Sequence, residues 1–167
     1  MGVLIASSQV HASLPPATEE KSAYPFAVPH GLETRVNFWK KVYTEYTTRQ
    51  AIVHDIDDLN IIYEVVNLEV PGSRHSEGRL NAVKNKYRNI LTELARKTDH
   101  SSLTMDESRV AQMVSGHYYE HAQNIRVQIG QKNRFREGLI RSGLYMDKIR
   151  KIFREYGLPD ELTALPH

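Results

Sequence analysis

The chain has 167 residues, of which 40% are hydrophobic and 25% are charged, so it is long enough to bury one real core. Its formal net charge of +2 is close to neutral and does not select a class of partner. The absence of cysteine excludes disulfides, thiolate metal sites, cysteine nucleophiles and a lipid-modified cysteine within these residues. No stretch approaches the roughly 20 apolar residues that span a bilayer.

The first 23 residues carry an incomplete secretion signal. Val3 to Ala6 is a short apolar run, and Val10 and Ala12 fit the positions at −3 and −1 that a signal peptidase reads. A complete signal also needs a basic start and an apolar core of about 7–15 residues, and both are lacking. Residues 1–23 are therefore either a signal remnant followed by a flexible linker rich in Ser, Ala and Pro, or a plain disordered tail.

Residues 24–156 are predicted to form one helical domain. Apolar residues at helical spacing predict a first helix over 32–47 and a second over 77–97. Between them, 51–54 and 60–66 are rich in β-branched residues and flank a polar turn, which predicts a β-hairpin. The apolar stripe of the first helix consists of Leu32, Val36, Trp39, Tyr43 and Tyr46.

Thr104 and Glu107 have the spacing of a capping box, in which each side chain bonds the backbone of the other residue. They predict the start of a long third helix over 105–142, broken near Gly116 or Gly130. Gly143 is expected to stop this helix, and 145–156 is expected to form a fourth. The predicted fold class is therefore mainly α, with about four helices and one small β-hairpin.

Two groups of residues have some character of a metal site, and a structural role is favoured for both. His117 and His121 stand four apart on a predicted helix, but no further ligand accompanies them, so packing is favoured over zinc. The run from His54 to Asp58 lacks the glycine and the distal Glu of a calcium loop. Asp residues in a hairpin turn commonly bond the local backbone, so a turn is favoured.

The carboxylates Glu155, Asp160 and Glu161 could suggest a glycosidase, since many such enzymes use a pair of carboxylates. A carboxylate that acts as a catalytic acid needs a desolvated pocket that raises its pKa. Glu161 in an exposed first helical turn is better suited to interact with the helix dipole. No residue of this chain is therefore predicted to be catalytic, to bind a cofactor or to bind a metal.

Basic residues are concentrated between Glu120 and Tyr156, where nine Lys and Arg face four acids, an excess of five. Such a patch is compatible with nucleic acid, anionic lipid or the anionic polymers of a cell wall, and with a plain solvated helix face. The aromatic residues here fall mostly on apolar stripes, which favours core packing over base stacking. We therefore predict no nucleic-acid partner and leave peripheral membrane association open. The nine are Arg126, Lys132, Arg134, Arg136, Arg141, Lys148, Arg150, Lys151 and Arg154.

The last residues combine a helix stop with a helix start. Gly157 suits the left-handed position after a helix, while Pro159 and Asp160 suit the first turn of the next one. A domain rarely finishes one turn into a new amphipathic element, so the sequence is interpreted as cut short at this point.

The run from Gln128 to Tyr145, followed by 157–162 and Leu165-Pro166-His167, resembles the segment that leads into the catalytic domain of peptidoglycan lytic transglycosylases. The most similar type is the membrane-bound lytic murein transglycosylase D group, with its lysozyme-like (SLT) domain. Residues 38–64 are similar to the region before that domain. The resemblance covers roughly residues 24–167 and is most specific over 124–167. In that family a tripeptide like the last three residues is followed at once by Val-Glu-Ser, whose Glu is the catalytic acid and base.

The resemblance implies that 157–167 begin a lysozyme-like domain, and that this chain is the non-catalytic N-terminal part of a cell-envelope or periplasmic enzyme. The parent would cleave the bond between N-acetylmuramic acid and N-acetylglucosamine, forming a 1,6-anhydro product without a metal or other cofactor. Its partner would be peptidoglycan, bound through the missing domain. Two alternatives remain open, an autonomous envelope scaffold or adaptor and a basic nucleic-acid-binding module; the oligomeric state is not predicted.

Overall fold

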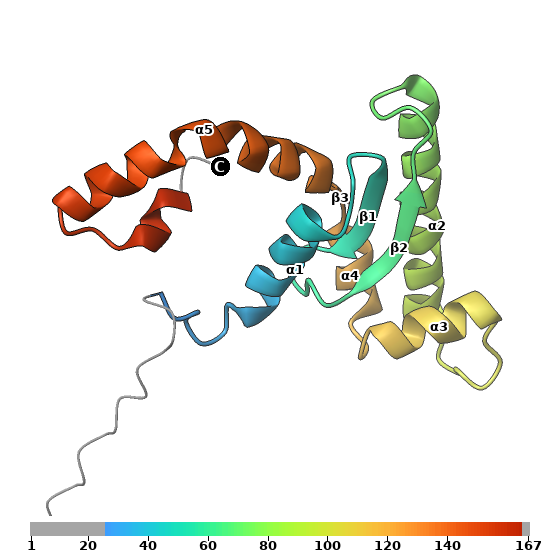
Figure 1. Ribbon diagram of the computed structural model, residues 1–167. Coiled ribbons are helices and arrows are strands. Elements are labelled where there is room, and N and C mark those ends of the chain that lie inside the picture. The colour runs from blue at the N-terminus through green and yellow to red at the C-terminus, as the bar shows by residue number, and fades with distance from the viewer. Residues whose placement is uncertain (1–25, 165–167) are drawn as a thin grey trace, which may run out of the picture.

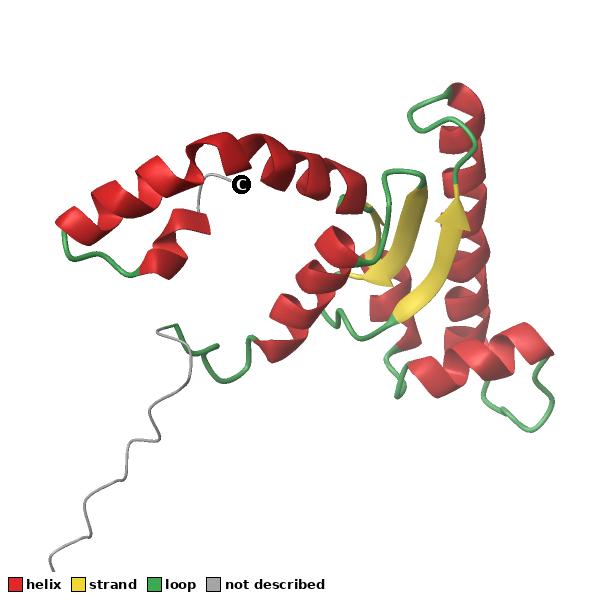
Figure 2. Cartoon of the chain, viewed as in Figure 1, coloured by secondary structure: helices red, strands yellow, loops and turns green. Residues whose placement is uncertain are grey.

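The computed structural model describes residues 26–164, so the predicted signal remnant and linker at 1–23 and the tripeptide from Leu165 to His167 lie outside the described residues. Within them, five α-helices and a three-stranded sheet form the fold, and helices account for about 58% of residues (Figure 2). In chain order the elements are α1 (Glu33–Thr44), β1 (Gln50–Asp55), β2 (Ile62–Asn67), α2 (Arg74–Arg96), α3 (Met105–Met113), α4 (Tyr118–Asn124), β3 (Ile125–Ile129), α5 (Lys132–Glu155) and the 3-10 helix η1 (Asp160–Ala164).

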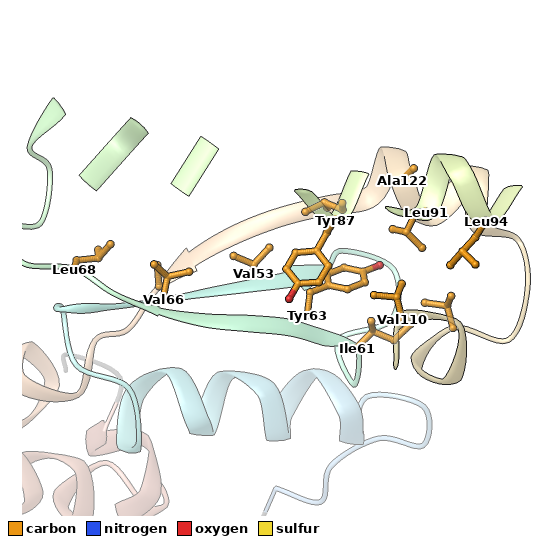
Figure 3. Packing of buried hydrophobic residues seen from close by; sticks show 13 residues of the cluster. Val53, Ile61, Tyr63, Val66, Leu68, Tyr87, Leu91, Leu94, Val110 and Ala122 are labelled. Carbon is orange, nitrogen blue, oxygen red and sulfur yellow. The ribbon is translucent and has the colours of Figure 1, made fainter. Parts of the chain in front are cut away.

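The small sheet has the strand order β2-β1-β3, and both neighbours of β1 run antiparallel to it. The central strand β1 is buried from Ala51 to Asp55 because helices cover both faces of the sheet. Helix α1 lies on one face, and α2, α3 and α4 lie on the other (Figures 1 and 3). The predicted hairpin is therefore confirmed as β1 and β2, within a larger sheet.

The main core lies between the sheet and α2. The predicted stripe of α2 is confirmed, since Tyr87, Leu91 and Leu94 are each at most 1% exposed and pack against buried strand residues (Figure 3). A smaller cluster on the opposite face joins Phe38 and Val42 of α1 to Ile52. Two clusters on the two faces explain why β1 carries successive apolar residues instead of strict alternation.

A β-bulge in β2 directs two consecutive side chains toward α2. The register with β1 shifts next to Tyr63, because Val53 pairs with Glu64 and His54 pairs with Ile62. The Tyr63 ring stacks on Tyr87 with centroids 5.2 Å apart, and the Tyr87 hydroxyl donates to the Glu64 carboxylate at 2.9 Å. The bulge therefore brings a carboxylate and an aromatic ring together against one helix.

The prediction of a long helix over 105–142, broken near Gly116 or Gly130, is right about both breaks and wrong about a helix filling the region between them. The helix α3 ends at Met113, Gly116 adopts a left-handed φ of 91°, and the short helix α4 leads into the strand β3. The predicted break near Gly130 is confirmed, since α5 begins only at Lys132. The predicted stop at Gly143 is wrong, because α5 continues through it to Glu155 and so includes the separately predicted helix 145–156.

The strand β3 lies at an edge of the sheet, where unpaired backbone groups invite pairing with another chain. Gly130 donates its N–H to Gln50 of β1, so the odd-numbered residues of β3 direct their backbone groups outward. The outward carbonyl of Ile125 accepts a bond from the Arg126 side chain, and that of Ile129 accepts one from Gln128. The strand therefore blocks part of its own edge with its side chains.

The predicted capping box at the start of α3 is confirmed. The Glu107 carboxylate accepts from the backbone N–H of Thr104 at 2.8 Å, and the Thr104 hydroxyl accepts from the N–H of Glu107 at 3.3 Å. The ammonium of Lys97 also donates to Glu107 at 2.7 Å. The bond from Lys97 and those from Thr104 lower the pKa of Glu107 from 4.5 to about 2.

This lowered pKa predicts a specific loss of stability in acid. A carboxylate whose pKa is lower in the folded state stabilises the fold fully above its unfolded value, and that contribution is lost as pH falls from 4.5 toward 2. We expect Glu107→Gln to lower the urea midpoint at pH 7 and to flatten the loss between pH 4.5 and pH 2. Glu137→Gln, at an exposed carboxylate of α5, is the control and should leave the profile unflattened. Parallel pH profiles for the wild type and Glu107→Gln would contradict the assignment.

Candidate interaction surface

Helix α1 has two apolar faces, and only one of them meets the core. Phe38 and Val42 are buried against the sheet, whereas Trp39 and Tyr43 are 43% and 42% exposed. The stripe predicted from periodicity is thus largely a surface feature. Contiguous exposed apolar surface is uncommon on a monomeric protein and marks sites of interaction.

The exposed face of α1 forms one wall of an open groove of about 620 Å³. The opposite wall is Phe135 in the first turns of α5, whose ring lies 5.5 Å from that of Tyr43. The rings of Trp39 and Tyr43 are 6.1 Å apart, so Trp39, Tyr43 and Phe135 form a continuous row of aromatic rings along the groove. The lining residues are Leu32, Arg35, Val36, Trp39, Lys40, Tyr43, Thr44 and Phe135.

The start of α5 is fixed to the end of α1 by backbone bonds. The N–H of Gln131 donates to the carbonyl of Val42 at 2.8 Å, and that of Lys132 donates to Tyr46 at 2.9 Å. Asn133 accepts from the N–H of Thr48 at 2.9 Å and donates to its hydroxyl at 2.8 Å. These bonds set the direction in which α5 leaves the sheet and hence the shape of the groove.

Beyond this junction α5 has no buried residue, and it projects away from the sheet (Figure 1). Leu139 lies one turn beyond Phe135 on the same side of the helix and is 45% exposed. Tyr145 and Tyr156 are also mostly exposed. An amphipathic helix that leaves much of its apolar side exposed offers a surface on which another domain or protein can dock.

The basic residues of α5 are partly neutralised within the described part of the chain. Arg141, Arg150 and Lys151 each lie 3.7–3.9 Å from an acid on the same helix. Arg154 binds Asp160 of η1 more closely, with its Nε 3.0 Å from Oδ1. Half of the eight basic residues of α5 are thus paired with an acid, which lowers the positive charge of this face.

The chain turns back on itself after α5. Gly157 has the predicted left-handed conformation, with φ of 66°, and η1 follows at Asp160–Ala164. The new element is a 3-10 helix packed against α5, in which Thr163 is only 4% exposed. Glu161 is exposed in its first turn, as expected for a residue that interacts with the helix dipole.

The two histidines of the predicted helix are not brought together as a pair. His117 precedes α4 in a left-handed conformation and is exposed, while His121 turns inward with its Nδ1 2.8 Å from the Asp55 carboxylate. No group of three or more His, Asp or Glu in residues 26–164 is placed to hold a metal ion. His121 therefore has the packed, hydrogen-bonded role that was favoured.

The run from His54 to Asp58 forms the favoured turn. The Asp55 carboxylate is fully buried and accepts from the backbone N–H groups of Asp57 and Asp58 at 2.8 and 3.0 Å. The same carboxylate contacts His121 and, at 3.4 Å, the hydroxyl of Tyr63. Asp55 therefore ties the turn, β2 and α4 together. This role could not be predicted from local patterns, because His121 lies 66 residues away along the chain.

A second polar cluster lies where β2, α2 and α3 meet. Arg109 donates to the Tyr87 hydroxyl at 2.7 Å and to the carbonyl of Tyr63 at 3.2 Å. Burial is the main cause that raises the pKa of the Tyr87 hydroxyl above its usual value of 10.0. The cluster is saturated by its own members, so its role is structural.

Together these elements define an α+β domain with a projecting helix and an aromatic groove at its base. No helix of the described residues is long and apolar enough to cross a membrane. No family model, curated protein or solved structure matches the chain.

Proposed function

We propose that this chain is the non-catalytic N-terminal part of a cell-envelope lytic transglycosylase that cleaves peptidoglycan strands. Residues 24–156 act as a support, and 157–167 begin the lysozyme-like domain, located with its parent in the periplasm or envelope. The proposal starts from the resemblance of 124–167 to the segment that leads into such domains. It is supported by the groove between α1 and α5, because an exposed apolar groove beside a helix without buried residues is suited to packing against a further domain.

The groove has the properties of an interface that holds a second domain. Its centre is aromatic, with Trp39, Tyr43 and Phe135 close enough to pack as one unit, and aromatic residues dominate the energetics of interfaces. Arg35 and Lys40 lie at its edge, as the polar rim of an interface requires. The first residues after Gly157 return along α5, the helix whose first turns form one wall of the groove.

The reading frame beyond His167 tests the proposal directly. We expect the codons for Val-Glu-Ser to follow at once, with a Gly-rich segment that contains Gln after them. A stop codon at that position would contradict the transglycosylase assignment and favour the autonomous scaffold.

Residues 1–167 alone should have no activity on peptidoglycan. The positioned acid that protonates the leaving oxygen would be absent, and such a group typically contributes 10²–10⁴ in rate. Release of anhydro-sugar fragments from purified sacculi, measured against a control without protein, is the assay. Any release above that control would contradict the proposed division of roles and would point to a carboxylate within this chain.

The support role predicts a substitution effect that depends on the following domain. In residues 1–167, Trp39→Ala should have a small effect on stability, because the ring is 43% exposed. In the longer protein the same change should cost about 2 kcal/mol or more, as for a buried aromatic at an interface centre. Leu144→Ala, at a residue 84% exposed, is the control and should have a small effect in both. Equal effects of Trp39→Ala in both proteins would exclude the groove as the interface.

A further inference from the structure

A second, smaller and more enclosed hollow of about 270 Å³ lies between α1 and β3. Arg35 and Trp39 line both this hollow and the groove, but the other walls differ in character. Arg35 enters from α1, His54 from the centre of the sheet, and Arg126 and Gln128 from β3. The register explains this grouping, since His54 pairs with Arg126 and both side chains lie on the α1 face of the sheet.

The hollow carries two positive charges and no acid. None of its lining residues is Asp or Glu, and within residues 26–164 no carboxylate lies within 4 Å of Arg35 or Arg126. Arg126 is held in place by donating from Nη1 to the carbonyls of Gln123 and Ile125. A guanidinium presents five donors, so its remaining N–H groups are available to an anion.

His54 is a rigid and uncharged part of the wall. The residue is 6% exposed, its ring lies 4.6 Å from that of Phe38, and its Nδ1 donates to the carbonyl of Asp55 at 2.7 Å. Burial lowers its pKa below 6.5, and the charge of Arg126 acts in the same direction. The positive charge in the hollow therefore comes from the two arginines, while Trp39 and Leu59 supply apolar surface beside it.

We propose that this hollow binds the C-terminal carboxylate of a short peptide, with the carboxylate on Arg35 and Arg126 and the last side chain against Trp39. Planar guanidinium groups match a carboxylate in shape and charge. The volume is below the range of about 300–1,000 Å³ typical of sites for whole drug-sized ligands, so it suits the end of a chain. The site shares Arg35 and Trp39 with the groove, but it does not rest on the proposed enzyme, and it is tested in residues 1–167, where no following domain covers the groove.

Trp39 provides a direct reporter because it is the only tryptophan of the chain. Titration of residues 1–167 with acetyl-alanyl-alanine should change the Trp39 fluorescence saturably, with a dissociation constant on the order of 1 mM. The backbone amide signals of Arg126 and Gln128 should shift with the same constant. Because the contact is ionic, higher salt should weaken binding.

Three further ligands separate the chemical classes. Acetyl-alanyl-alanine amide has the same shape without the charge, and acetate and inorganic phosphate carry charge without the peptide. We expect the amide and acetate to bind at least about tenfold more weakly, since the first lacks the charge-assisted bonds and the second the apolar contact. Phosphate binding as tight as that of the peptide would overturn the proposal in favour of a general anion site, and equal binding of the amide would overturn the role of the arginines.

Variants at exposed arginines test the site without threatening the fold. Arg35→Gln and Arg126→Gln should each weaken peptide binding about tenfold. Arg134→Gln, at an exposed arginine of α5 outside the hollow, is the matched control and should leave binding unchanged. Unchanged binding in both hollow variants, or no saturable binding by the wild type, would overturn the proposal.

Discussion

Gly130→Ala should destabilise the protein by about 3 kcal/mol, the upper part of the range for overpacked sites. A Cβ at this position would lie 2.5 Å from the carbonyl oxygen of Thr47 and still closer to that of Tyr46. Gly130 is not among the glycines with positive φ, so alanine could adopt its backbone and the whole cost is steric. Both obstacles are backbone atoms, which cannot rotate away as a flexible side chain would.

Gly138→Ala is the matched control, because Gly138 lies within α5 and a Cβ there meets no atom within 4 Å. It should stabilise the protein by about 0.5–1 kcal/mol, as glycine-to-alanine changes in open helix positions do. Urea unfolding followed by circular dichroism measures both. Effects of the same sign and size at the two positions would show that the close approach of β3 to the end of α1 is not tight.

Asp55→Ala should cost about 3 kcal/mol or more, because it leaves several buried hydrogen-bond donors without an acceptor, at about 1–3 kcal/mol each. The carboxylate is 0% exposed, and its loss leaves the N–H groups of Asp57 and Asp58 and the Nδ1 of His121 without their acceptor. Since two of these donors lie in the turn and the third lies on α4, the turn and α4 should both loosen. Amide exchange should show lost protection in 56–61 and 118–124.

Asp57→Ala is the control for this prediction. Asp57 is exposed and accepts a bond from Asn124, so its removal should cost less than about 1 kcal/mol. In a double-mutant cycle, His121→Ala should cost much less in the Asp55→Ala background than in the wild type. Additive effects of the two substitutions would mean that the 2.8 Å contact between Asp55 and His121 carries no coupling.

Local patterns predicted the elements whose stability is local. The α2 stripe, the Thr104 capping box and the left-handed Gly157 all depend on residues within a few positions of one another, and each is confirmed. The predicted fold was therefore right as a mainly helical domain with a small sheet. It was wrong in giving about four helices instead of five, and a hairpin instead of three strands.

The strand β3 shows why local reasoning fell short. Ile125, Val127 and Ile129 alternate with Arg126 and Gln128, a period of two that is typical of a strand. The alternating pattern covers only five residues and lies between segments with helical patterns, so it was predicted as part of a helix. The strand β1, with which β3 pairs, lies about 75 residues earlier in the chain. The partner decides the outcome, since an isolated strand gains little from its own sequence.

The candidate surfaces depend on the same long-range pairing. Trp39 and Tyr43 were predicted to be part of an apolar stripe, but which face of α1 meets the sheet is settled by Phe38 and Val42 packing on Ile52. Arg35 and Arg126 face one hollow only because β3 lies beside α1. Neither surface could be found from spacing along the chain.

The attachment of α5 has a mechanical consequence. The helix has 24 residues and is therefore about 36 Å long, yet its bonds to the end of α1 and the loop after it all come from its first turn and from Gln131 just before it. The helix is thus attached to the rest of the domain mainly at its N-terminal end, next to Gly130. If α5 rotates as a rigid helix by about 10° about its N-terminal end, its C-terminal end moves by roughly 6 Å. The tight backbone contact at Gly130 therefore sets the direction of α5 and, with it, the position of the residues that follow Tyr156.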